Sequence, residues 1–172
     1  MSYIDWIQHL GFIDNPQDKT ILELGCGRGT KTLCDTFKYV YSFETWHNDE
    51  WYEYTLRELQ DKKNWSSYYK DFSYYGLSGD AIRPQTKAFE KYNKELEQWI
   101  DLSTVDVAFV DQGFYLRGES VNYFMSRNIP IIFAHDTNKI PHKYGWDVIN
   151  PTKYGYTVNK KKEGQGVTFF TK

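Results

Sequence analysis

Apolar and polar positions along the chain fall into blocks that predict short strands separated by helices. Strands are expected at residues 21–24, 39–44, 66–70, 105–110 and 130–134, and helices at residues 30–37, 48–60, 85–100 and 116–127. The fourth of these strands is almost wholly apolar, which is typical of a strand that is buried on both faces. Regular alternation of strand and helix predicts a parallel sheet with helices on both of its faces.

The C-terminal part of the chain departs from this alternation. Tyr154–Val158 and Val167–Thr171 flank a segment rich in lysine and glycine, which predicts a hairpin at the edge of the sheet. We expect Tyr156, Val167 and Phe169 to pack there, so that the sheet ends in an antiparallel C-terminal edge hairpin. The segment Pro141–Pro151 has two prolines and no helical period, and it predicts an irregular lid in place of a crossover helix.

Nothing in the chain indicates a second domain. Residues 1–172 show no internal repeat, no linker and no low-complexity tract, and residues 1–18 are expected to form an N-terminal cap segment. Within that segment, residues 3–10 predict a helix or cap against the sheet. The fold class is therefore expected to be α/β: a single Rossmann-like, doubly wound sheet of about seven strands, mostly parallel, with the antiparallel hairpin at its edge.

Composition narrows the functional classes. The net charge of −2 and the isoelectric point near 6.1 argue against a nucleic-acid-binding protein that uses a broad basic face. No apolar run is long enough for a membrane span, and the first residues lack the layout of a signal peptide, so a cytoplasmic location without a membrane partner is expected. Cys26 and Cys34 are too few for a disulfide framework and are expected to be reduced.

Three glycines at alternate positions directly follow the first strand. Gly25, Gly27 and Gly29 let the backbone approach a ligand where a Cβ atom would clash, and a helix that opens there directs free N–H groups toward it. The second strand ends in Glu44, and an acid in that place accepts hydrogen bonds from the hydroxyls of a ribose. Taken alone, the glycines also suit a tight turn without a ligand, but together with Glu44 they predict a nucleoside site.

Acidic residues also end the fourth and fifth strands. Asp111 follows the apolar run 107–110, and His135 and Asp136 follow residues 131–134. Neighbouring strands lie about 5 Å apart, so the carboxylates should share one pocket, where they repel one another unless a proton or a cation lies between them. A divalent ion held by Asp111, Asp136 and His135 would relieve that repulsion, and oxygen ligands favour magnesium, calcium or manganese, of which Mg²⁺ or Mn²⁺ is expected. The alternatives are that the acids cap helices and that His135 has a purely structural role.

These motifs carry a resemblance to a known family. The segment from Glu23 to Gly29 resembles the acid-x-G-x-G-x-G motif of class I S-adenosylmethionine-dependent methyltransferases. The stretches at residues 105–113 and 131–137, with the later Arg117, resemble the metal-dependent sugar and small-molecule O-methyltransferases. So does the acid-then-Trp-Tyr segment at residues 43–52. Arg117 could pair with Asp111 or with an acidic substrate.

The resemblance implies S-adenosylmethionine as the cofactor and, with it, a divalent cation. The implied cofactor-binding residues are Glu23, Gly25, Gly27, Gly29, Glu44, Asp80 and Asp111; Asp80 enters through a Gly-Asp-Ala triplet at residues 79–81. The implied catalytic residues are Asp111 and His135, and the implied metal ligands are Asp111, His135 and Asp136. The resemblance implies an enzyme that methylates a hydroxyl of a sugar, a glycan or another small molecule, so the expected partner is such an acceptor.

Two other functions stay open. The chain could be an inactive nucleoside-binding module of the same fold that acts as an interaction subunit. A nucleic-acid methyltransferase is less favoured, because no Asn-Pro-Pro-Tyr or Asp-Pro-Pro-Tyr motif follows the fourth strand. The sequence gives no expectation for the oligomeric state.

Overall fold

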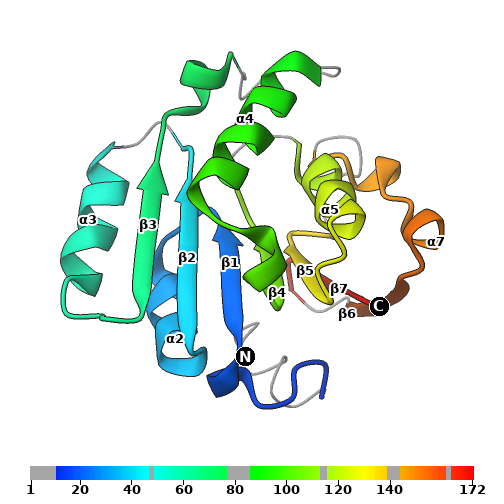
Figure 1. The fold of residues 1–172 in the computed structure, drawn as a ribbon, viewed down its shortest axis with the longest axis horizontal. Helices are drawn as coiled ribbons and strands as arrows, with labels where there is room; N and C mark the ends of the chain where they lie inside the picture. Colours follow the sequence, from blue (N-terminus) through cyan, green and yellow to red (C-terminus); the bar gives the residue numbers. More distant parts are fainter. Residues whose placement is uncertain (1–10, 47–48, 77–85, 113–115, 139–143, 162–163) are drawn as a thin grey trace.

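One mixed sheet organises the protein. The computed structural model describes residues 11–46, 49–76, 86–112, 116–138, 144–161 and 164–172. The strands are β1 (Thr20–Leu24), β2 (Tyr39–Glu44), β3 (Trp65–Tyr69), β4 (Val107–Val110), β5 (Ile131–His135), β6 (Thr157–Lys161) and β7 (Val167–Thr171). They form a seven-stranded sheet in the order β3-β2-β1-β4-β5-β7-β6 (Figure 1). This is the doubly wound α/β architecture that the alternating pattern predicts.

Helices connect the strands. The α-helices are α2 (Arg28–Thr36), α3 (Asp49–Leu59), α4 (Thr86–Trp99), α5 (Arg117–Ser126) and α7 (Pro151–Tyr154). Short 3-10 turns are η1 (Pro16–Asp18), η2 (Phe72–Tyr75), η3 (Leu102–Thr104) and η4 (Trp146–Val148). Among the described residues, no helix is both long enough and apolar enough to cross a membrane.

The two faces of the sheet carry separate apolar cores. Helices α4 and α5 lie in front of the sheet in the view of Figure 1, and α2 lies behind it. Tyr92 and Leu96 of α4 and Phe124 of α5 belong to one buried cluster. Leu33 of α2 and Leu59 of α3 belong to the other. Because both faces are covered, the central strand β4 is wholly apolar and shows no alternation.

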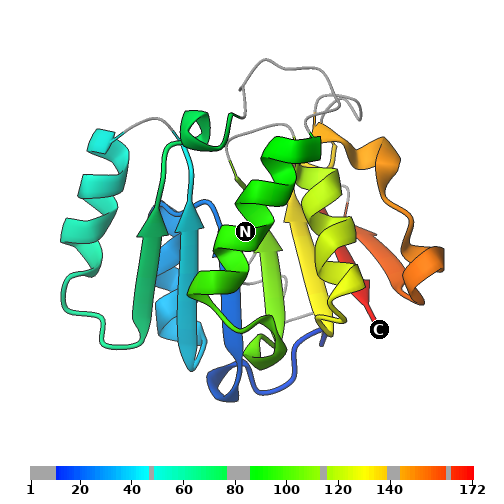
Figure 2. The same cartoon turned by 45° about the horizontal axis from the view of Figure 1, so that its top comes forward.

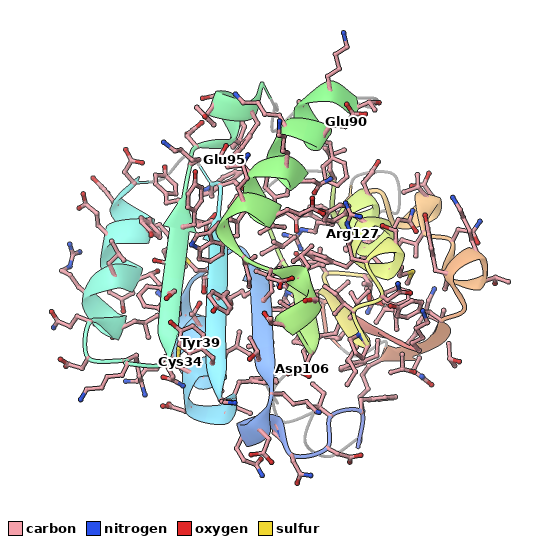
Figure 3. The ribbon with its side chains drawn as sticks, viewed as in Figure 1. Cys34, Tyr39, Glu90, Glu95, Asp106 and Arg127 are labelled. Atoms are coloured by element: carbon pink, nitrogen blue, oxygen red, sulfur yellow. The ribbon has the colours of Figure 1, made fainter. Side chains whose placement is uncertain are left out.

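Strand register brings the functional ends together. Within the parallel part of the sheet, Leu24 pairs with Phe43 on one side and with Val110 on the other. Glu44 and Asp111 each come one residue later in the chain, so they lie at the same edge as the turn after β1. The arrowheads of β1 to β5 all point to this edge, which is uppermost in Figure 2. Asp106, labelled in Figure 3, precedes β4 and lies at the opposite edge.

The terminal hairpin is present, but its first strand begins later than the sequence pattern predicts. Tyr154 belongs to α7, and β6 begins only at Thr157. The side chain of Asn150 caps α7 by accepting the Lys153 N–H at 3.1 Å, and Gly155 ends the helix with φ of 75°. Asn-Pro before and Gly after a short helix are its usual start and stop signals, and they outweigh the weak strand pattern of residues 154–156.

Strand β7 supplies the antiparallel pairing. It pairs with β5 on one side and with β6 on the other, so β6 forms the outer edge of the sheet. Tyr156, Val167 and Phe169 are buried, as predicted. The hydroxyl of Tyr156 donates to the Ile129 carbonyl at 2.6 Å, which ties the hairpin to the end of α5. The predicted helix or cap at residues 3–10 lies outside the described residues.

Truncating Phe169 should cost much of the stability. Its ring is fully buried and stacks on Phe12 and Phe133 at centroid distances of 4.7 and 5.7 Å. We expect Phe169→Ala to lower the free energy of unfolding in urea by about 3–5 kcal/mol. Val158→Ala on the neighbouring strand is the control, because Val158 is 38% exposed and its loss should cost less than about 0.5 kcal/mol. Equal effects of the two substitutions would contradict the assignment of β7 to the core.

Candidate functional site

The turn after β1 requires glycine at its first position. Gly25 has φ of +88°, and a Cβ atom on it would lie 2.8 Å from the Asp111 carbonyl oxygen. Its N–H donates to the Phe43 carbonyl at 3.0 Å, so the turn is joined to β2. Any side chain at residue 25 would therefore strain the backbone and push the turn away from the end of β4.

A buried acid beneath the turn holds it in place. Glu23 is 2% exposed, and its Oε2 accepts hydrogen bonds at 2.8 Å from the hydroxyls of Thr30 and Ser42. The Thr30 hydroxyl also accepts the Gly27 N–H at 2.9 Å. Glu23 thus fixes the start of α2 and the middle of the glycine turn through one hydroxyl. The sequence motif indicates the acid but not its two hydroxyl partners.

Glu44 binds backbone N–H groups on both sides of the pocket. Its Oε2 accepts from Cys26 at 2.8 Å, and its Oε1 accepts from Thr45 and Trp46 at 2.7 Å each. Burial raises the pKa of this carboxyl above its usual value, although the three N–H groups and a hydrogen bond with the Cys26 thiol act in the opposite direction.

Trp51 lies against the glycine turn. Its Nε1–H donates to the Cys26 carbonyl at 2.9 Å, and a Cβ atom on Gly27 would lie 2.6 Å from its Cζ2. Gly27 has extended backbone geometry that any residue could adopt, so the ring and not the backbone requires glycine here. The Trp-Tyr segment is visible in the sequence, but no sequence pattern indicates this contact.

These groups line one pocket of about 460 Å³ at the carboxyl edge of the sheet. Its walls are formed by Glu23, Gly25, Cys26, Gly27, Arg28, Gly29, Glu44, Trp46, Trp51, Phe109, Asp111 and Arg117. Every glycine and every acid predicted for the nucleoside site is among them, except Asp80, which lies outside the described residues. A concave site with three acids and several aromatic rings suits a ligand that has both a flat part and a positive charge.

Asp111 is also part of a charged cluster at the ends of β4 and β5. The Nη1 atom of Arg117 lies 2.8 Å from Asp111 Oδ1 and 3.1 Å from Asp136 Oδ2. The Nδ1 atom of His135 lies 3.4 Å from Asp111 Oδ1 and 3.6 Å from Asp136 Oδ1. The structure therefore brings together the three residues predicted as metal ligands and places a guanidinium between their carboxylates.

Packing from the segment that follows β5 holds the cluster in place. The guanidinium carbon of Arg117 lies 4.3 Å from the ring centre of Tyr144, and Trp146 Nε1 donates to the Asp136 carbonyl at 3.2 Å. A Cβ atom on Gly118 would lie only 1.8 Å from the Gly145 carbonyl oxygen, so the first turn of α5 packs directly on this segment. Asp136 itself has φ of 64°, a conformation that aspartate tolerates better than most residues.

The charges of the cluster act on His135. Burial alone would lower the pKa of the imidazole, but the hydrogen bond and charge of Asp111, together with the charge of Asp136, outweigh it. The net effect raises the pKa of His135 above its ordinary value, although the charge of Arg117 opposes the shift. His135 therefore keeps its proton to a higher pH than a free imidazole does, with Asp111 Oδ1 3.4 Å from its Nδ1.

The cluster meets only part of what a divalent cation needs. Ligand atoms of Asp111, His135 and Asp136 lie within 4.8 Å of one another, which suits a small ion. However, Arg117 is hydrogen-bonded to both carboxylates, and it supplies the positive charge that the sequence argument assigned to the metal. The donor set as it stands therefore does not fit a metal ion, and metal binding stays an untested prediction.

Comparisons with known proteins show the fold. The Aeropyrum pernix fibrillarin structure, solved with bound S-adenosyl-L-methionine, matches with a TM-score of 0.65 at 12% identity, covering 98% of this chain and 74% of fibrillarin. An rRNA methylase from Streptococcus thermophilus matches with a TM-score of 0.54 at 14% identity, covering 92% of this chain and 89% of the methylase. Precorrin-6y C5,15-methyltransferase from Geobacter metallireducens matches with a TM-score of 0.57 at 12% identity, covering 90% and 80%.

The likeness is structural and not detectable in sequence. No family model matches the chain, and no curated protein matches it significantly. The seven-stranded sheet with its antiparallel β7 is the Rossmann-like methyltransferase fold of these solved structures. Because the identities are so low, the likeness establishes the fold, and the chemistry has to be argued from the pocket.

Burial of Glu23 should make stability depend on pH. Burial raises the pKa of its carboxyl to about 8, and the charges of Asp111 and Glu44 add to the shift. A raised folded-state pKa gives stability that is complete below the usual value of 4.5 and is lost as the pH rises through about 8. Each pKa unit corresponds to about 1.4 kcal/mol, so Glu23→Gln should unfold at a higher temperature than the parent at pH 8 but not at pH 4.5.

The matched control is Glu53→Gln, because the side chain of Glu53 is 66% exposed on the outside of α3. Thermal unfolding of the parent and both variants between pH 4.5 and pH 8.5 provides the measurement. The curves of the parent and of Glu53→Gln should run together, whereas that of Glu23→Gln should be flatter. A parallel curve for Glu23→Gln would show that Glu23 is ionised in the folded protein.

Proposed function

We propose that the protein transfers a methyl group from S-adenosylmethionine to a hydroxyl oxygen of a small molecule, with a sugar or glycan as the first candidate. The observation that carries this proposal is the single pocket that joins the glycine turn and Glu44 to Asp111. One side of it has the groups that a nucleoside needs, and the other side has an acid coupled to a histidine. The fold of several methyltransferases supports the proposal.

The cofactor would lie over the ends of β1 and β2. An acid at the end of the second strand suits the hydroxyls of a ribose, and Glu44 borders the pocket beside the alternating glycines. Glu44 borders this part of the pocket with an acidic group, which suits the positive sulfonium and ammonium groups of S-adenosylmethionine. Trp46 and Trp51 offer rings at the same opening.

The chemistry that remains for the protein is alignment and removal of one proton. The carbon–sulfur bond of the sulfonium breaks as the carbon–oxygen bond forms, so the cofactor leaves as a neutral thioether. The acceptor hydroxyl loses its proton to the pair of Asp111 and His135, and solvent then takes it up. Asp111 lines the pocket, so of Asp111 and His135 it is Asp111 that would contact the acceptor.

Two observations favour a small hydroxylated acceptor. The ends of β4 and β5 carry the Asp111 and His-Asp pattern that resembles sugar and small-molecule O-methyltransferases. The chain has a net charge of −2, which does not favour a nucleic-acid partner that needs a broad basic face. The alternative is a nucleoside-binding module without transfer activity, which would bind the cofactor and modify no acceptor.

Cofactor binding should be visible as thermal stabilisation. At a concentration roughly 100 times Kd, S-adenosylmethionine should add about 2.7 kcal/mol, a rise of roughly 5–10 °C in Tm. Gly27→Val should abolish the rise, because the new side chain forces the Trp51 ring out of its place beside the turn. Lys31→Ala is the control, because Lys31 is exposed on α2 and does not line the pocket. A normal rise for folded Gly27→Val would mean that the cofactor site is misplaced.

Asp111 should be needed for transfer but not for cofactor binding. With labelled S-adenosylmethionine and a panel of sugars, glycans, phenols and RNA, Asp111→Asn should lower transfer by roughly 10²–10⁴-fold and leave the thermal shift almost unchanged. Asp106→Asn is the matched control, because Asp106 precedes the same strand at the far edge of the sheet and accepts the Thr20 N–H at 2.8 Å (Figure 3). It should leave transfer intact.

Each outcome of the acceptor panel has a separate meaning. Transfer to a sugar, glycan or phenol that depends on Asp111 supports the proposal. Transfer to RNA alone would replace the acceptor class, and cofactor binding without transfer to any acceptor would favour the nucleoside-binding module. Transfer that Asp111→Asn does not reduce would remove Asp111 from the mechanism and leave it a structural role.

A further inference from the structure

Arg117 is positioned as a fixed part of the charged cluster. Its side chain is only 6% exposed, and its Nε donates to the Gln112 carbonyl at 2.7 Å. Its Nη1 donates hydrogen bonds to Asp111 Oδ1 at 2.8 Å and to Asp136 Oδ2 at 3.1 Å. A guanidinium with this many directed contacts cannot leave its place without breaking a buried ion pair.

Packing of the backbone around Arg117 limits movement of its side chain away from the cluster. It is the first residue of α5, and the next residue, Gly118, packs on the Gly145 carbonyl so closely that a methyl group would not fit. The ring of Tyr144 covers the guanidinium on one side at 4.3 Å. The arginine is therefore held from the helix, from the loop after β4 and from the segment that follows β5.

The position of Arg117 conflicts with the presence of a divalent ion. An ion held by Asp111 and Asp136 would sit between the same two carboxylates that Nη1 bridges, and the two cations would repel each other at close range. Two carboxylates and one guanidinium together carry only one net negative charge. Arg117 has therefore already offset half of the charge that would draw a metal into the cluster.

We propose that Arg117 is the permanent cation of this cluster and that it takes the place of a divalent metal ion. Within the described part of the chain its Nη2 has no hydrogen-bond partner, and Arg117 borders the pocket. Nη2 can therefore donate to the acceptor oxygen as negative charge develops on it, a task that a metal performs in metal-dependent enzymes. This last step rests on the proposed methyl transfer, whereas the charge argument does not.

The test uses Mn²⁺ alone, followed by its electron paramagnetic resonance signal and by thermal unfolding. The parent protein should neither bind Mn²⁺ at the cluster nor change its Tm. Arg117→Met should be less stable than the parent, should bind about one Mn²⁺ per chain and should regain Tm when the ion is added. Combining Arg117→Met with Asp136→Asn should remove that binding, because the ion then loses a carboxylate ligand.

Arg127→Met is the matched control. Arg127 follows the last residue of the same helix, at the opposite end from Arg117, and pairs with Glu97. It should behave like the parent toward Mn²⁺. If Arg117→Met does not fold alone, refolding in Mn²⁺ replaces the titration: recovery supports the inference and failure to recover overturns it.

Three results would overturn the inference. The first is that the parent binds Mn²⁺ and loses this binding in Asp136→Asn. The second is that Arg117→Met folds but binds no more Mn²⁺ than the parent. The third is that methyl transfer by the parent stops in chelator and returns when Mn²⁺ is added. Transfer that is unchanged in chelator supports it. Absence of transfer altogether would count against the proposed function, while the Mn²⁺ titration would still decide the role of Arg117.

Discussion

The hydrogen bond between the Glu44 carboxylate and the Cys26 N–H determines the shape of the pocket. It joins the end of β2 to the turn after β1, across two strands whose parallel register already places them side by side. The second oxygen of the same carboxylate holds the backbone of Thr45 and Trp46, so the chain leaves the sheet in a defined direction. Charge-assisted hydrogen bonds of this kind are strong when buried, and Glu44 is only 3% exposed.

Glu23 complements Glu44 from below the turn. Its hydroxyl partners come from α2 and from β2, so the turn that connects β1 to α2 is supported from both of these elements. The neutral carboxyl that burial favours can also donate one hydrogen bond, which an ionised carboxylate cannot. Glu23 therefore mainly supports the turn, whereas Glu44 supports the turn and, in the proposed function, also contacts the cofactor.

Much of the fold could be predicted because the strongest signals are local. The limits of β2 and the acid that ends it follow directly from the apolar run and its stop at Glu44. The glycine turn and the cluster of Asp111 and Asp136 follow from a general rule about the ends of parallel strands. The start of β6 was predicted three residues too early, because a four-residue helix was not recognised between Asn150 and Gly155.

The contacts that could not be predicted depend on register and on the direction of side chains. Ser42 reaches Glu23 because the two residues are paired across β1 and β2, and no sequence pattern specifies that pairing to the residue. The double contact of Arg117 depends on where α5 begins and on how closely Gly118 approaches Gly145. A sequence alone allows Arg117 to pair with Asp111, but only the packed structure places it against Asp136 as well.

The acidic residues in the two halves of the pocket differ in how their charge is compensated. Three acids line its walls, and Arg117 compensates Asp111 while no cation makes a direct ion pair with Glu44 among the described contacts. Burying an acid in this way costs stability unless hydrogen bonds or a positive ligand offset the cost. At Glu44 backbone N–H groups supply part of the offset, and a cationic ligand would supply more. In the half of the pocket over β1 and β2, Glu44 could therefore interact with a cationic ligand. In the half over β4 and β5, Asp111 is already paired with Arg117.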